Sequence, residues 1–153
     1  MLTTDEKRRN KITRTHERFR ALTIGKCKTE ALREFQKLRR MECANSDLDC
    51  ICISCGKASA WDACDAGHYL SRRFNSTAFS KNNCWTQCVH CNQYLSGNQS
   101  EYRKALVSKI GVCEVLFLET LKDIDLTFNK FQLATLREIF KEQQRTQKER
   151  LAL

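Results

Sequence analysis

Two Cys-x-x-Cys pairs constrain the fold of this chain more than any other feature of its sequence. The first pair is Cys52 and Cys55, the second is Cys88 and Cys91, and 32 residues lie between them. Two intervening residues let both thiolates of a pair face one ion, so the pairs can together hold a tetrahedral zinc ion. A zinc ion with four cysteine ligands has no open position for water, so we expect it to be structural. Such a clamp would bring both ends of the intervening segment together.

The sequence leaves other uses of the cysteines open. There are ten cysteines in 153 residues, and Cys50, two positions before Cys52, could compete as a zinc ligand. A Cys-x-x-Cys pair can also be a redox dithiol, but that chemistry usually occurs at a strand-to-helix turn of a βαβ unit, which this sequence does not predict. The remaining five are expected to be small apolar residues: Cys27, Cys43, Cys64, Cys84 and Cys113.

The N-terminal sequence favours a cytoplasmic protein. "MLTTDEKRRNK" lacks the apolar stretch of a signal peptide. The chain has no apolar run near the roughly 18 residues that a membrane-spanning helix needs, so we expect no membrane partner. A reducing cytoplasm disfavours disulfides, which strengthens the zinc interpretation.

The positive charge is concentrated at the N-terminus. The net charge is +9, and residues 1–43 carry 13 Lys/Arg against 6 Asp/Glu, a net +7. A basic arm beside a nearly neutral remainder indicates a polyanionic partner such as nucleic acid, although a solvated basic helix is the plainer alternative. The candidate DNA-binding residues of this arm are Lys7, Arg8, Arg9, Lys11 and Arg14.

Helical periodicity predicts helices on both sides of the cysteine-rich segment, over residues 4–23, 28–42, 98–110, 113–124 and 131–150. We expect Thr4 to cap the first helix and Gly25 to end it. Asn98 and Glu101 are spaced as a capping box, and Gly111 can end that helix. The apolar faces at Leu32–Met41 and Leu133–Phe140 are candidate packing or dimer surfaces.

Between these helices, residues 51–92 predict a zinc knuckle, two short strands, a connecting loop and one helix. We therefore predict an α+β fold with a zinc-stabilised ββα core and flanking helices. The expected division is a basic helical arm over residues 1–43, a zinc-knuckle core over 44–111 and C-terminal helices over 112–153.

His68 follows the first cysteine pair, Asn83 precedes the second, and Asn92 follows it directly. This order resembles the HNH, or His-Me finger, nucleases. The resemblance implies that His68 is the general base on a water molecule, that Asn83 orients its imidazole, and that a helix residue such as Asn92 helps to bind one divalent metal ion at the scissile phosphate. Histidine suits the role because its reference pKa lies near neutrality.

The segments "CISCG", "DAGHYLSR" and "QCVHCNQYLSGNQSEYRKAL" resemble the NinG/Rap family of lambdoid phages closely over residues 50–111. The resemblance implies a structure-specific endonuclease for branched recombination intermediates, including Holliday junctions and D-loops, encoded by a phage or prophage and acting in the bacterial host cell. It implies structural Zn²⁺ and catalytic Mg²⁺ or Mn²⁺. A homodimer is expected, since symmetric cutting of two strands needs two active sites.

The sequence departs from the common HNH pattern just before the histidine. Many HNH enzymes carry a metal ligand at the position of Gly67, which has no side chain. Asp65 is the nearest carboxylate and a candidate catalytic residue and metal ligand. Three positions along a strand place it on the opposite face from His68, unless a bulge or turn at Ala66–Gly67 re-aims it. Asn98 and Glu101 are further candidate metal ligands, with the capping box as their alternative role. The choice of Asn83 over Asn82 also stays open.

Basic residues near the predicted hairpin and the following helix could bind phosphates, because Arg offers a bidentate fork. They are Arg72, Arg73, Lys81 and Arg103. A non-catalytic zinc protein that binds DNA junctions is the main alternative function, and a thiol redox protein is a third.

Overall fold

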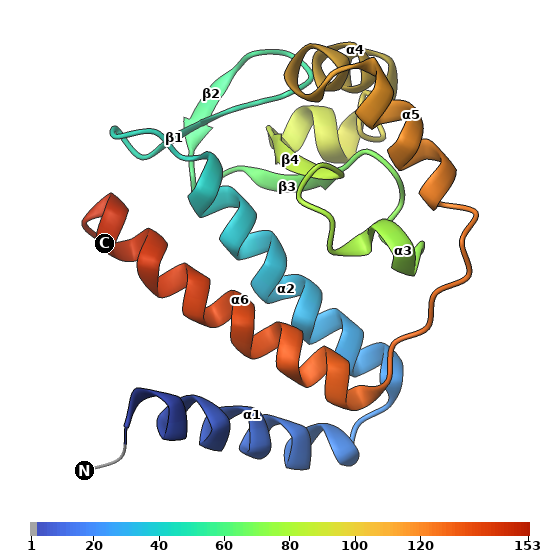
Figure 1. Ribbon diagram of the computed structural model, residues 1–153. Coiled ribbons are helices and arrows are strands. Elements are labelled where there is room, and N and C mark those ends of the chain that lie inside the picture. The colour runs from blue at the N-terminus through green and yellow to red at the C-terminus, as the bar shows by residue number, and fades with distance from the viewer. Residues whose placement is uncertain (1–2) are drawn as a thin grey trace.

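The structure, a computed structural model that describes residues 3–153, combines helices with two small antiparallel sheets (Figure 1). The elements follow in the order α1 (Thr4–Arg20), α2 (Ile24–Cys43), β1 (Asp49–Ile51), β2 (Ala58–Ala60), β3 (Asp65–His68), α3 (Asn75–Ala78), β4 (Cys84–Gln87), the short π-helix η1 (His90–Tyr94), α4 (Gln99–Ile110), α5 (Val112–Leu121) and α6 (Lys130–Leu151). The predicted α+β class is confirmed.

Helices α2 and α6 lie side by side and run in the same direction at the centre of the molecule, and α1 packs on the far side of α6 (Figure 1). On α2, Phe35 and Leu38 point into a core that includes Phe140 of α6 and Ala66 of β3. Both predicted apolar faces are therefore buried within the chain. This core contains residues from all three segments of the predicted division: residues 1–43, 44–111 and 112–153.

The first helix begins at Thr4 as predicted, whereas α2 begins at Ile24, four residues before the predicted start. Thr3, not Thr4, caps α1: its hydroxyl accepts from the Glu6 backbone N–H, and the Glu6 carboxylate accepts from the Thr3 backbone N–H at 2.7 Å. Gly25 does not break a helix but lies in the first turn of α2, which Thr23 caps through Lys26. The predicted cap and break were wrong because a nearby threonine supplied a better hydrogen-bond acceptor.

The capping box predicted for α4 was also wrong. Asn98 has a left-handed backbone, with φ 44° and ψ 55°, and its side chain makes no capping hydrogen bond. Its amide donates to the Cys91 thiol sulfur at 3.6 Å, while Glu101 pairs with Lys104. Gly111 ends α4 as predicted, with φ 85°.

Strands β3 and β4 pair antiparallel, with Gly67 opposite Trp85 and His68 opposite Cys84. The loop that joins them contains α3, and η1 follows β4 after two residues. The order is therefore strand, loop, strand and short helix. Strands β1 and β2 form a separate hairpin, which the Ile53 backbone N–H joins to Thr86 of β4 at 2.9 Å.

A second core under α4 and α5 holds the sheet from the other side. Tyr102 and Leu106 of α4 are fully buried there with Val115 of α5. The Tyr102 hydroxyl donates to the Gly67 carbonyl and accepts from the Trp85 backbone N–H, both at 3.0 Å. One side chain thus joins α4 to β3 and β4.

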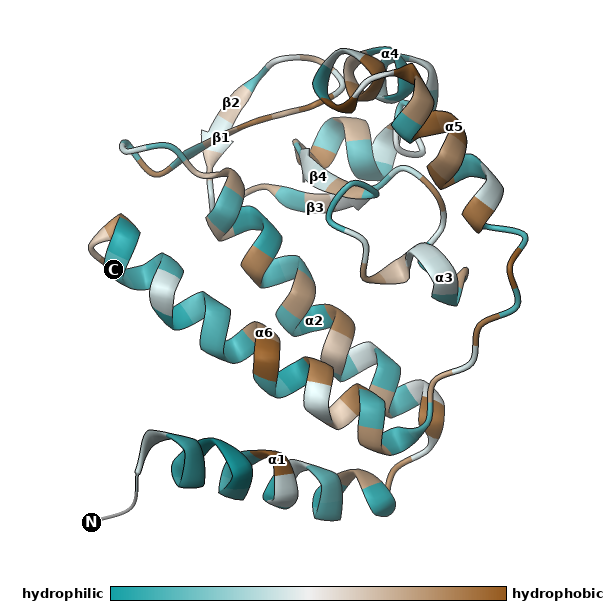
Figure 2. Cartoon of the chain, viewed as in Figure 1, coloured by the Kyte–Doolittle hydropathy of each residue, from teal (hydrophilic) through white to brown (hydrophobic). Residues whose placement is uncertain are grey.

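Helix α5 keeps an apolar outer face, including Phe117 at 59% exposure (Figure 2). Within residues 3–153, none of the helices is both long enough and apolar enough to cross a membrane.

Candidate functional site

The four paired cysteines form one thiol cluster. Cys52 and Cys55 lie in the turn after β1, and Cys88 and Cys91 lie at the end of β4 and in η1. Their sulfur atoms all lie within 4.8 Å of one another, and those of Cys55 and Cys88 are 3.8 Å apart. A tetrahedral site with Zn–S bonds of about 2.3 Å has sulfurs about 3.8 Å apart, so the cluster can hold a metal ion such as zinc.

Two hydrogen-bond donors point at sulfur atoms of the cluster, while burial raises the pKa of Cys91. The Cys91 backbone N–H lies 3.5 Å from the Cys88 sulfur, and the Asn98 amide lies 3.6 Å from the Cys91 sulfur. Gly56, with φ 74°, allows the turn that brings its N–H to the Cys52 carbonyl. Donors aimed at sulfur stabilise its charged form, which is the form that binds metal.

Cys50 lies outside this cluster. It is buried, and its thiol donates to the Arg40 carbonyl at 3.2 Å. A hydrogen bond with Cys64, together with burial, raises the pKa of Cys50 and keeps it protonated. The possibility that Cys50 is a zinc ligand was therefore wrong, because its side chain turns into the core beside Met41.

His68 ends β3 and is half-buried, with its Nε2 atom 3.0 Å from the Ala78 carbonyl oxygen. A carbonyl can only accept, so Nε2 carries the proton and Nδ1 keeps its lone pair. Burial lowers the pKa of His68, and the positive charges of Arg72 and Lys28 lower it further, against the opposing effect of the Ala78 carbonyl. The imidazole is therefore neutral at pH 7, with Nδ1 available as a base.

Asn83 builds the loop around His68 and does not touch the imidazole. It is fully buried, its Oδ1 accepts from the Leu70 backbone N–H at 2.7 Å, and its Nδ2 donates to the carbonyls of Leu70 and Thr77. By bonding the Thr77 carbonyl, Asn83 fixes the residue next to Ala78. The carbonyl of Ala78 in turn orients the imidazole. Asn82 is exposed and takes part only through its backbone carbonyl, which accepts from Trp85.

Asn92, at the third position of η1, lines an open cavity with His68. Its Nδ2 donates to the Asp65 carboxylate at 2.9 Å, as does the Gln93 amide. Asp65 lines the neighbouring cavity, which Asn92 also borders, but not the one with His68. Asp65 and His68 therefore lie on opposite faces of β3, as expected. The hydrogen bond from Asn92 connects Asp65 to the His68 cavity. Neither Asn98 nor Glu101 lines these two cavities.

Gly67 is fixed by packing on its inner side. A Cβ atom at this position would lie 2.0 Å from Oε1 of Gln87, which is fully buried. The Gln87 amide donates to the Ser54 hydroxyl and the Gly97 carbonyl, both at 2.7 Å. The position before His68 therefore faces Gln87, and a ligand side chain there would have no room.

The predicted phosphate-binding residues differ in their partners. Arg72 lines the cavities of both His68 and Asp65, and Arg73 stacks over Phe74. Lys81 pairs with Glu42, and Arg103 pairs with Glu119 at 2.8 Å, so carboxylates already neutralise both. The five basic residues predicted on α1 are exposed, and α1 lies across α6 from the strands (Figure 1).

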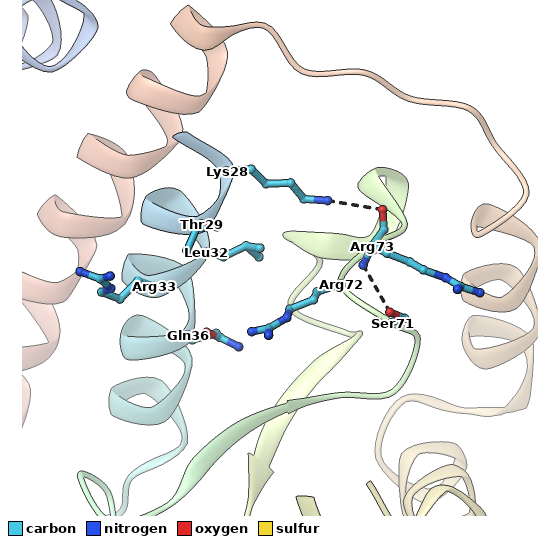
Figure 3. Close-up of a pocket in the computed structure, with 8 residues that line it drawn as sticks. All are labelled: Lys28, Thr29, Leu32, Arg33, Gln36, Ser71, Arg72 and Arg73. Carbon is cyan, nitrogen blue, oxygen red and sulfur yellow. Dashed lines mark hydrogen bonds between the residues drawn. The ribbon is translucent and has the colours of Figure 1, made fainter. Parts of the chain in front are cut away.

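Helix α2 contributes polar residues to the cavities that the sequence prediction did not include. Gln36 lines the His68 cavity, and Arg33 and Arg40 line the Asp65 cavity. In a third, adjoining cavity, Lys28 and Arg72 lie opposite one another (Figure 3). The sequence did contain a sign of these residues. The spacing of Arg33, Gln36 and Arg40 places them on one stripe of the helix, beside the buried apolar stripe.

Comparisons with known proteins point to one family. A family model described as "Bacteriophage Lambda NinG protein" matches residues 2–151. Protein ninG of Salmonella phage P22 is 40% identical over 77 residues, which cover 48% of this chain and 36% of that protein. Protein ninG of Escherichia phage lambda is 44% identical over 68 residues, which cover 42% of this chain and 32% of that protein. The matches thus span about a third of each relative's length. No solved structure matches. Because the family model covers nearly the whole chain, this chain belongs to the NinG family of lambdoid phage proteins.

Proposed function

We propose that this protein is a metal-dependent endonuclease for branched DNA, acting on Holliday junctions and D-loops during phage recombination in the bacterial cytoplasm. Strands β3 and β4 with η1 would be its ββα-metal core. The observation that carries the proposal is the neutral His68, which lines a cavity with Asn92 and Arg72 and uses Nε2, not Nδ1, to bond the Ala78 carbonyl. These residues provide a base, an oxygen ligand and a cation in one place.

In the proposed reaction, His68 Nδ1 removes a proton from the water that attacks phosphorus. The Ala78 carbonyl holds Nε2–H and stabilises the imidazolium that forms. Arg72 contacts a non-bridging oxygen of the phosphate. The reaction breaks the bond between phosphorus and the leaving oxygen of the DNA strand.

The donor set beside His68 fits Mg²⁺ or Mn²⁺. Asp65 holds the Nδ2 atom of Asn92, which leaves the Asn92 Oδ1 atom free to bind a cation. Amide and carboxylate oxygens suit these hard ions, and Mg²⁺ commonly uses one or two protein ligands together with waters and substrate phosphate oxygens. A bound ion would stabilise the charge that develops on the phosphate.

The thiol cluster would act as a structural zinc site. It joins the turn after β1 to the end of β4 and to η1. Strand β4 carries Thr86, and η1 carries Asn92. Zinc there would keep Asn92 in register with His68 without entering the reaction. Symmetric cutting of a junction would require a homodimer.

The test is nicking of a synthetic four-way junction in Mg²⁺ or Mn²⁺. We expect His68→Ala to lower the rate by a factor of about 10² to 10⁴, the usual contribution of a general base. The matched control is His90→Ala, because His90 is exposed in η1 and should cleave as the wild type does. Undiminished cleavage by His68→Ala would remove His68 from the mechanism.

A non-catalytic zinc protein that binds DNA junctions is the second candidate. The position of Gly67 favours it, because no ligand side chain fits there and, among residues 3–153, the His68 cavity is lined by two amides, Asn92 and Gln36, and by no carboxylate. This alternative predicts tight junction binding with no cleavage in any divalent metal. The same assay, read for both binding and nicking, separates the two candidates.

A further inference from the structure

A groove lined by cations runs along α2, opposite the loop that follows β3 (Figure 3). At one end it is a cavity of about 480 Å³ with Lys28 on one wall and Arg72 on the other. Gln36 and Arg72 continue into the His68 cavity and then into the Asp65 cavity, where Arg40 stands. The reacting histidine thus lies between two basic ends of one groove.

Two cations of this groove donate to backbone carbonyls and not to carboxylates: Lys28 to that of Arg73 at 3.4 Å and Arg40 to that of Cys64 at 3.2 Å. In the part of the chain that the structure describes, Lys28, Arg40 and Arg72 form no ion pair. Burial and the neighbouring charge of Arg72 lower the pKa of Lys28. The Nε atom of Arg40 is buried without a hydrogen-bond partner among these residues. Like charges held together and a buried unpaired donor are costly unless an anion complements them.

The dimensions of the groove fit a short run of DNA backbone. Lys28 and Arg40 are 12 positions apart on α2, which corresponds to about 18 Å at the helical rise of 1.5 Å per residue. A stacked strand, as in a DNA duplex, advances about 3.4 Å along the helix axis per nucleotide, so this length spans about five stacked nucleotides. Within residues 3–153, no Phe, Tyr or Trp side chain lines the three cavities, and His68 is the aromatic ring that borders them. Contacts to phosphates, not to bases, match this lining.

We propose that α2 carries one DNA strand across the active site, where Arg72 contacts the scissile phosphate, with Lys28 binding a phosphate on one side of it and Arg40 binding a phosphate on the other. The proposal rests on the proposed function for its ligand, DNA, but requires only binding. It assigns the strand contact to α2, whereas the exposed charges of α1 lie across α6.

The test measures binding of fluorescent single strands of three to ten nucleotides at several salt concentrations, with His68→Ala as the parent to prevent cleavage. We expect Lys28→Gln with Arg40→Gln to weaken binding at least about tenfold and to reduce the slope of log affinity against log salt by about 1.4, which is about 0.7 for each phosphate contact on a single strand. Parent affinity should rise with length and level off near five nucleotides.

Two controls separate charge from structure. Arg9→Gln with Lys11→Gln removes two exposed α1 charges and should leave short-strand binding unchanged. Arg40→Lys keeps the charge but loses the guanidinium bond to the Cys64 carbonyl, and it should keep the salt slope. Zinc content and thermal melting confirm that each variant folds.

Parent-like affinity and slope in the folded Lys28/Arg40 double variant would overturn the α2 assignment. Short-strand binding that instead depends on Arg9 and Lys11 would do the same. If the wild type never cleaves but the double variant loses binding, the proposed nuclease function fails and the groove stands. If the wild type cleaves and the double variant binds normally, the groove fails and the nuclease stands.

Discussion

At the scale of single residues, the environment of His68 predicts how stability depends on pH. Burial, Arg72 and Lys28 lower its pKa in the folded protein, whereas an unfolded histidine titrates near 6.5. As the pH falls below about 6.5, His68 gains a proton in the unfolded chain before it does so in the folded one. His68 therefore lowers the free energy of unfolding in this range and has no such effect well above pH 6.5.

The His68→Gln variant should therefore lose less stability than the wild type between pH 7.5 and pH 5. Urea unfolding across this range measures the difference, with His90→Gln as the exposed control. A loss in His68→Gln equal to that of the wild type would contradict the lowered pKa. If the protein cleaves DNA, the acid limb of its pH–rate profile should lie below the ordinary histidine value, because the base must be neutral.

Single residues also mark the limit of what sequence could predict at the site. Cysteine spacing located all four members of the thiol cluster, because two intervening residues restrict where the paired sulfurs can lie. The same approach recognised that Gly67 cannot ligate, but not that buried Gln87 occupies the adjacent space. Ala78 could not be identified, because it orients His68 through a carbonyl that every residue possesses.

At the scale of elements, the thiol cluster connects short pieces that could not be stable alone. Strands β1 to β4 have three or four residues each, and η1 has five. Two-stranded sheets of this length are marginal in water, so their order depends on what joins them. Tyr102 joins β3 and β4 to α4, and the four cysteines join the β1 turn to β4 and η1.

Removal of the metal should therefore loosen this half of the molecule first. A chelator, or Cys52→Ser, should abolish stoichiometric zinc and lower amide-exchange protection in β4 and η1. Helical circular dichroism should largely persist, because the core of α2 and α6 contains none of the four ligands. The control is Cys113→Ser, an exposed cysteine on α5. Full zinc content in Cys52→Ser would exclude Cys52 as a ligand.

Helix ends were less predictable than helix positions. The pattern placed five helices correctly in outline, but competition between neighbouring acceptors decided their caps. Thr3 replaced Thr4, Thr23 started α2 before Gly25, and Asn98 served the cysteine cluster instead of α4. A sequence shows which side chains can cap, whereas the tertiary structure decides which acceptor each N–H meets.

At the scale of the whole molecule, α2 connects stability with the proposed chemistry. Its buried stripe packs on α6 and on β3, and its polar stripe lines the groove beside His68. The amphipathic pattern predicted that the faces at Leu32–Met41 and Leu133–Phe140 would be covered, but it could not say by what. They are largely covered by each other within one chain, so the expected homodimer would have to use another surface.

Phe35 is the residue at which these two roles of α2 meet. Its fully buried ring lies 5.2 Å from that of Phe140, 5.8 Å from that of Phe79 and 6.2 Å from that of His68, measured between centroids. Phe35→Ala should lower the free energy of unfolding by about 3–5 kcal/mol, because the surrounding helices and strand cannot close the cavity completely. Urea unfolding measures this change. The matched control is Phe117→Ala on the exposed face of α5, which should cost no more than about 0.5 kcal/mol. Equal costs for the two variants would mean that the packing of α2 on α6 and β3 does not dominate the stability of the molecule.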